Sequence, residues 1–162
     1  EGQSEKAFGL LMEAFGLAPQ SPVVRNEFVS FLSASAQNLL AAGDLQEASL
    51  QYQVILNYSP SEFWPLYHMV NLAMRAGSSD VAAGFLERGL RSYPHSPLMI
   101  GLRGKCKGSL GDWRGACRDL RTAIRMLPGK VELWKDYAFF LRAAGDAKEA
   151  ELAETEASRL GQ

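Results

Sequence analysis

The chain comprises 162 residues, of which 47% are hydrophobic and 22% charged, and its formal net charge at pH 7 is −1. This composition is typical of a folded domain and excludes a disordered chain, while the near-neutral charge gives no general attraction to nucleic acid or to membranes. Because no apolar run approaches the ~20 residues that span a bilayer, we also expect no membrane insertion.

The amino-terminal sequence predicts no secretion signal. Residues 1–4 lack the basic start and the following apolar stretch of a signal peptide, and the chain has no initiator methionine. We therefore expect the chain to be part of a longer protein or a processed form. The compartment stays open, with the cytoplasm slightly favoured.

The first predicted element is a helix over residues 4–18. Pro19 follows Ala7 by twelve residues, and the same interval separates Ala48 from Pro60 in the next unit. Residues 4–18 are therefore predicted to be the second helix of an incomplete hairpin, because self-similar spacing is the signature of a repeat array.

Residues 22–62 are predicted to form the first complete unit, which consists of a helix, a tight turn and a second helix. Ser21 is a capping residue, and Gly43 supplies the left-handed backbone that ends the first helix. Ala48 is small enough for the two helices to cross closely. Ala48 follows Ala7, the equivalent alanine of the incomplete hairpin, by seven residues more than the 34-residue period of the later units. We place these extra residues in a long first helix over 22–42. The alternative is a longer link before that helix.

The same markers recur every 34 residues and predict further units at 63–96, 97–130 and 131–162. Glycines end the first helices, and small alanines follow five residues later; these markers are Gly43, Gly77, Gly111 and Gly145, then Ala48, Ala82, Ala116 and Ala150. The residue after each glycine is predicted to cap the next helix, with reciprocal caps at Asp44–Glu47 and Asp146–Glu149. Prolines end the second helices at Pro60, Pro94 and Pro128. No segment alternates as a strand does, so we predict an all-α fold.

The last predicted helix, over residues 147–160, is unusually acidic. Its glutamates are Glu149, Glu151, Glu154 and Glu156. A polar outer face on a terminal helix stops further stacking, so we interpret this helix as the carboxyl-terminal cap of the array.

The pattern resembles the tetratricopeptide repeat (TPR), counted from Val29, Phe63, Pro97 and Val131. The large fourth residue is Leu32, Leu66, Ile100 and Trp134, and the small eighth residue is Ala36, Gly104 and Ala138, with Val70 departing from it. The aromatic position of the second helix holds Tyr52, Leu86, Leu120 and Glu154. The resemblance implies a single array over residues 1–162, a right-handed superhelix of hairpins whose first helices line a concave groove.

The resemblance also implies which side chains face that groove. The candidate peptide-binding residues are Gln37, Trp64, Tyr67, Asn71, Arg75, Lys105 and Phe139. Trp64, Tyr67 and Asn71 share a helical face, because they are three and four residues apart. Lys105 is expected to approach them from the next repeat. The alternative is that Trp64 and Tyr67 pack against a neighbouring helix.

Three glycines at residues 101, 104 and 108 leave one smooth helical face, although glycine costs roughly 1 kcal/mol relative to alanine inside a helix. Gly104 fits the small position of the repeat. Gly101 and Gly108 are predicted to open the groove wall to a ligand backbone, or else to mark a weak helix that its neighbours hold in place.

A basic stripe lies on the second helix of the third unit. Its members, spaced to share one face, are Arg114, Arg118, Arg121 and Arg125. This convex face is interpreted as solvated, with binding of an acidic partner, lipid or nucleic acid as the alternative. Cys106 and Cys117 flank the same turn and are interpreted as packing residues, with a disulfide or redox role as the alternative.

No arrangement of residues indicates catalysis, a cofactor or a metal site, and His68 is interpreted as structural. We therefore expect a protein-interaction scaffold that binds a peptide or partner protein in the concave groove, and not an enzyme. Two alternatives stay open. One is the regulatory or substrate-recruiting part of a larger enzyme or of a secretion or assembly apparatus. The other is a self-assembling scaffold whose groove receives the incomplete hairpin of another copy.

Overall fold

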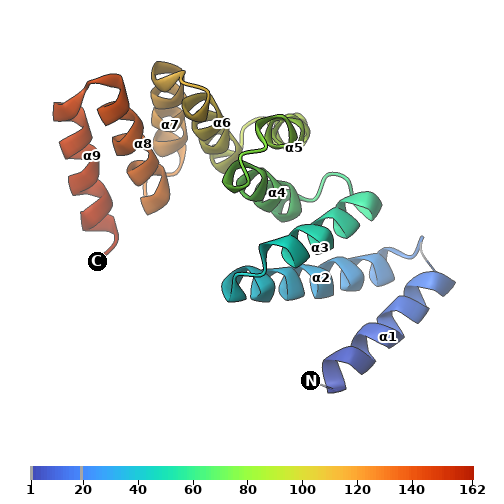
Figure 1. Ribbon diagram of the computed structural model, residues 1–162. Coiled ribbons are helices and arrows are strands. Elements are labelled where there is room, and N and C mark those ends of the chain that lie inside the picture. Colours follow the sequence, from blue (N-terminus) through green and yellow to red (C-terminus); the bar gives the residue numbers. More distant parts are fainter. Residues whose placement is uncertain (1, 19) are drawn as a thin grey trace. The chain divides into compact units, whose positions relative to one another are not determined.

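The computed structural model describes residues 2–18 and 20–162, except for the side chains of residues 2–5 and 7. Glu1 and the predicted marker Pro19 lie outside the described residues, as does the side chain of Ala7. The described part of the chain is built of α-helices and contains no strand, which confirms the all-α prediction (Figure 1). The helices are α1 (Gly2–Leu17), α2 (Pro22–Ala42), α3 (Leu45–Tyr58), α4 (Phe63–Arg75), α5 (Ser79–Ser92), α6 (Pro97–Ser109), α7 (Trp113–Met126), α8 (Val131–Ala144) and α9 (Ala147–Leu160).

Each predicted glycine turn has the backbone conformation that favours glycine. The φ angles are 91° at Gly43, 71° at Gly77, 87° at Gly111 and 91° at Gly145. At the first of these turns the N–H of Asp44 donates to the carbonyl of Leu39 at 2.9 Å, which satisfies an otherwise unpaired helix end. These four glycines therefore allow the chain to reverse direction between the two helices of each hairpin.

The helix caps differ in part from the prediction. The Ser21 hydroxyl accepts from the N–H of Val24, and the Asp112 carboxylate accepts from the N–H of Gly115 at 2.8 Å. Asp44 and Asp146 make no side-chain cap bond, so the reciprocal caps predicted there are wrong. At the start of α9, the Glu149 carboxylate accepts hydrogen bonds from side chains of α7 and α8 and does not cap the helix.

The helix α2 is longer than the other helices that open a hairpin. It comprises 21 residues, so the additional residues lie in the helix and not in the link before it. Its amino-terminal part packs against α1, where the Phe15 ring stacks on Phe28 at 4.5 Å and meets Tyr58 edge-on at 4.7 Å. The extra turns therefore give α1 an aromatic surface to pack on.

The chain forms two compact units, one extending to Leu72 and the other from Ala73 to Gln162. In the first unit, α2 and α3 pack closely because Ala36 and Ala48 are fully buried where the two helices cross. In the second unit, α7, α8 and α9 share one core, which includes Leu120 and Tyr137. The predicted division of residues 1–162 into one array with set repeat boundaries stays a prediction.

None of the described helices combines the length and the apolar character that crossing a bilayer requires.

Candidate functional site

An aromatic cluster lies on α4 in the first unit. Trp64 is 52% exposed, and its ring meets that of Tyr67 edge-on at a centroid distance of 5.8 Å. Tyr67 also stacks on Phe63 at 6.3 Å and meets His68 edge-on at 5.5 Å. The sequence prediction that Trp64 and Tyr67 lie together on one helical face agrees with this geometry. The half-exposed indole offers a large apolar contact to a ligand.

The base of this cluster is anchored in the core. The His68 ring stacks on Tyr52 of α3 at 5.0 Å, and Tyr52 is fully buried. Burial lowers the pKa of His68, so its imidazole is neutral at physiological pH. Burial also raises the pKa of Tyr52 to about 12. His68 therefore serves as a packing residue that links α4 to α3, as the sequence predicts.

The polar candidates have unused bonding capacity. The Asn71 side-chain amide donates to the Tyr67 carbonyl at 2.9 Å, and within the described residues its Oδ1 atom has no partner. Gln37 on α2 and Arg75 at the end of α4 are exposed. An amide oxygen held in place in this way can accept an N–H from a ligand backbone.

The second unit has its own exposed face on α8. Phe139 is 66% exposed and meets the buried Phe140 edge-on at 5.0 Å. Beside it, the Lys105 ammonium of α6 pairs with the Asp136 carboxylate at 3.4 Å. Burial raises the pKa of Asp136, and the nearby charge and hydrogen bond of Lys105 oppose that rise. Exposed aromatic rings are enriched at protein-binding surfaces, and polar groups surround them at the rim.

The predicted approach of Lys105 to the aromatic cluster on α4 joins the two units and stays a prediction. So does the assignment of all seven candidates to one groove. The structure places Trp64, Tyr67 and Asn71 together in the first unit, and it places Lys105 near the ring-bearing face of α8 in the second.

The glycine face of α6 serves packing and does not open a groove wall. A Cβ atom at Gly101 would lie 2.6 Å from Cδ2 of Leu133, and one at Gly108 would overlap the Phe140 ring. Gly104 instead approaches the backbone of α7, where a Cβ would lie 3.0 Å from the carbonyl oxygen of Ala116. The predicted opening for a ligand backbone is wrong, because side chains of α8 fill that space.

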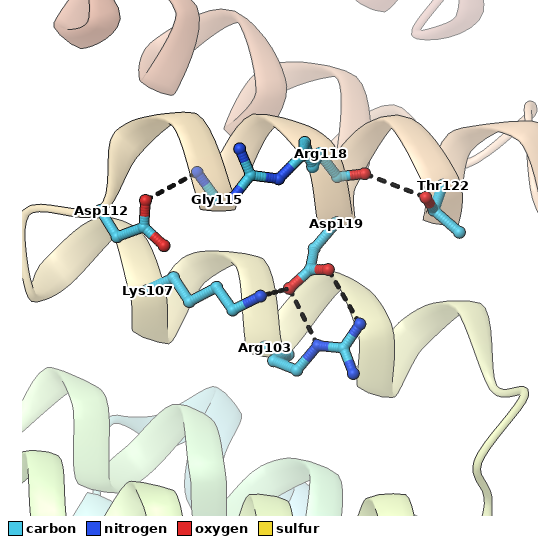
Figure 2. A network of polar contacts seen from close by, with 7 residues as sticks. All are labelled: Arg103, Lys107, Asp112, Gly115, Arg118, Asp119 and Thr122. Atoms are coloured by element: carbon cyan, nitrogen blue, oxygen red, sulfur yellow. Dashed lines mark hydrogen bonds and ion pairs between the residues drawn. The ribbon is translucent and has the colours of Figure 1, made fainter.

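A buried carboxylate that the sequence analysis did not single out joins α6 to α7. The Asp119 side chain is buried, and the residue is 7% exposed. Its carboxylate accepts two hydrogen bonds from Arg103, at 2.8 and 2.9 Å, and forms an ion pair with Lys107 at 2.8 Å (Figure 2). Burial raises the pKa of Asp119, but the hydrogen bonds and charges of Arg103 and Lys107 together bring it below its usual range. The sequence signal for this contact is that Asp119 is the one acidic residue within a helix rich in arginine.

The arginine stripe of α7 is divided in the structure. The Arg121 guanidinium donates to Tyr137 Oη at 2.9 Å and to Glu149 at 2.8 Å, so it belongs to a network that joins α7, α8 and α9. Tyr137 also donates to Glu149. Arg114, Arg118 and Arg125 are exposed, and their guanidinium groups have no partner within the described residues. Only part of the stripe is therefore a solvated face.

The two cysteines have different neighbours and are both free thiols. The Cys106 thiol lies 3.5 Å from the sulfur of Met74, and Cys117 is 8% exposed within the core of the second unit. Burial raises the pKa of both thiols. These contacts agree with the interpretation of the cysteines as packing residues.

We expect both thiols to react slowly with a disulfide reagent in the native state, because the reactive thiolate is scarce and shielded at neutral pH. Cys117 should be slower than the half-buried Cys106. Timed labelling of the Cys106→Ser and Cys117→Ser variants, with the unfolded chain as the reference for full reactivity, assigns each rate. Rapid native labelling of Cys117 would contradict the packing interpretation.

Among the described residues no three His, Cys, Asp or Glu side chains are placed to hold a metal ion. No protein-family model matches the sequence, and no curated protein matches it significantly.

Solved structures do match the fold. MamA (residue 41 to the end) from Desulfovibrio magneticus RS-1 matches with a TM-score of 0.67 and 16% identity over 99% of this chain and 96% of that one. PilF from Pseudomonas aeruginosa matches with a TM-score of 0.72 and 14% identity over 84% of this chain and 62% of that one. An O-GlcNAc transferase from Thermobaculum terrenum matches with a TM-score of 0.68 and 17% identity, over 72% of this chain but 22% of the transferase. At these identities the likeness concerns the fold.

Proposed function

From the TPR-type helical fold that the chain shares with these structures, we propose that it is a protein-interaction scaffold. Its partner is a peptide or a protein that contacts the exposed faces of the helices that open each hairpin. This role is one of binding and not of catalysis.

The observation that carries the proposal is the aromatic cluster on α4, whose tryptophan is half exposed. Trp64 is 52% exposed although its neighbours on the same helix reach into the core through the His68–Tyr52 stack. Scattered exposed apolar residues need no explanation, but a rigid group of rings around a half-exposed tryptophan is typical of an interface centre. The anchoring limits the side-chain entropy that binding would cost.

The chemistry of the cluster favours a polypeptide ligand. The rings of Trp64 and Tyr67 supply apolar contact area. The Oδ1 atom of Asn71, which has no partner among the residues that the structure describes, can accept a main-chain N–H. In the second unit, Phe139 beside the Lys105–Asp136 pair repeats the combination of an exposed ring with polar groups. A peptide offers both apolar side chains and backbone bonding groups.

We expect Trp64→Ala to weaken binding by at least about 2 kcal/mol, the usual threshold for an interface hot spot, which corresponds to roughly 30-fold in affinity. The fold should persist, because half of the indole is already in contact with solvent. Ligands for the measurement come from a random dodecapeptide display library selected on the whole chain. Their affinities are then measured by calorimetry for the wild type, Trp64→Ala and Tyr67→Ala.

Trp113→Ala is the matched control. Trp113 is 46% exposed and begins α7, the second helix of its hairpin, so its loss removes a similar indole from another face. Peptides that bind every variant with equal affinity would contradict the proposal. A loss of helical signal in Trp64→Ala would show that the indole belongs to the core.

A second candidate is the recruiting part of a longer protein. The chain spans 62% of the PilF structure and 22% of the transferase structure, so similar folds occur as parts of longer chains. Self-association is the remaining candidate, and mass measurement over a range of concentrations tests it. A mass that stays monomeric would argue against it.

A further inference from the structure

A cavity of about 440 Å³ lies in the second unit between α7 and the turn that joins α8 to α9. The guanidinium-bearing residues Arg114, Arg118 and Arg121 line one side of it. Leu141 and Ala144 add an apolar part, and the start of α9 closes the other side. The cavity lies on a second helix and is separate from the α4 cluster and from the ring-bearing face of α8.

Two of the three arginines are available to a ligand. Arg114 and Arg118 are one helical turn apart, both are exposed, and their side chains have no partner in the part of the chain that the structure describes. Figure 2 shows the Asp119 carboxylate turned toward α6, where Arg103 and Lys107 neutralise it, while the Arg118 side chain lies apart from that cluster. The one acid of α7 next to Arg118 therefore does not compete for its guanidinium.

One of the two acids of the cavity is already engaged by neighbouring side chains. Glu149 accepts from Tyr137 and from Arg121. The Asp146 carboxylate does not cap α9. The first N–H groups of that helix, which form its positive end, therefore make no hydrogen bond to this carboxylate. Counting three arginines against Asp146 and Glu149, the lining has a formal charge of +1.

We propose that this cavity binds the carboxylate side chain of an acidic segment in a partner protein. A single carboxylate brings the lining to neutrality and can form paired hydrogen bonds with a guanidinium group. The methylene groups of a glutamate fit against Leu141 and Ala144. A phosphate dianion would leave the cavity with excess negative charge beside Asp146 and Glu149, so the charge balance favours a carboxylate.

The probes are an acetylated and amidated Gly-Ser-Glu-Glu-Glu-Ser-Gly peptide, its glutamine counterpart, and inorganic phosphate. They are titrated into the whole chain at low ionic strength, and the Nε–Hε resonances of the arginines are followed by NMR. We expect saturable shifts for Arg114 and Arg118, with the glutamate peptide binding at least about tenfold more tightly than the glutamine peptide, since charge-assisted hydrogen bonds carry the contact.

Charge-matched variants separate the cavity from general electrostatics. Arg118→Gln should lower the affinity for the glutamate peptide. The double variant Arg114→Gln with Arg118→Gln should lower it further, by about tenfold. Arg125→Gln removes the same charge from the same helix outside the cavity and should have little effect. Equal losses in Arg118→Gln and Arg125→Gln, or equal binding of the two peptides, would overturn the proposal. Tighter binding of phosphate than of the glutamate peptide would overturn the carboxylate assignment.

The test is independent of the proposed α4 surface. Trp64→Ala should keep the affinity of the wild type for the glutamate peptide, because Trp64 belongs to the first unit and the cavity to the second. Failure of one proposal is thus distinguishable from failure of the other.

Discussion

Replacing Asp119 by alanine is expected to lower the free energy of unfolding of the second unit by about 2–3 kcal/mol. The substitution removes the carboxylate that pairs with Arg103 and Lys107 across the α6–α7 hairpin. The two cations retain partial contact with water, with side-chain exposures of 41% and 38%, so the cost is smaller than the roughly 3–5 kcal/mol of a fully buried pair.

The measurement is urea unfolding followed by tryptophan fluorescence in a Trp64→Phe background. The remaining tryptophans, Trp113 and Trp134, then report on the second unit. Glu87→Ala is the matched control: it also removes one carboxylate, but its pair with Arg91 is exposed and is worth less than about 1 kcal/mol. Equal effects of the two substitutions would contradict the structural role of Asp119.

The same carboxylate predicts a pH dependence. The pKa of Asp119 in the folded protein lies below its usual range, so the folded state binds its proton less readily than the unfolded chain does. The stabilisation is therefore fully present above the unfolded pKa of about 4 and is lost as the pH falls through the folded value. The difference in stability between the wild type and Asp119→Ala should shrink below about pH 4.

Gly108→Ala is expected to destabilise the second unit by about 1–3 kcal/mol, although alanine is the better helix former. A Cβ at this position would overlap the ring of Phe140, which is buried in the core of the second unit. The cost of overpacking therefore exceeds the gain in helix propensity. Urea unfolding in the same Trp64→Phe background measures it.

Gly84→Ala is the control for helix propensity alone. Gly84 lies within α5, and a Cβ there would meet nothing within 4 Å, so this change should stabilise the protein by up to about 1 kcal/mol. A double-mutant cycle of Gly108→Ala with Phe140→Ala should show favourable coupling, because the smaller side chain removes the overlap. If Gly108→Ala stabilises as Gly84→Ala does, the close contact between α6 and α8 is not required.

The sequence by itself determined where the chain turns between the two helices of each hairpin. Gly43 and its three equivalents turn the chain because a left-handed φ is favourable without a Cβ, and Ser21 caps α2 through a contact only three residues away. These are local properties, and the repetition at 34 residues made each one visible several times. The buried alanines followed as well, because close helix crossing requires a small side chain wherever the hairpin folds.

Only the tertiary structure decided what several of the candidate side chains do. Gly108 lies against a ring from the next hairpin, and Arg121 bonds to residues of two later helices. Asp119 is buried because Arg103 and Lys107 come to lie opposite it across the turn. Spacing along a helix predicts which face a residue occupies. Which residue of another helix contacts that face depends on how the helices pack.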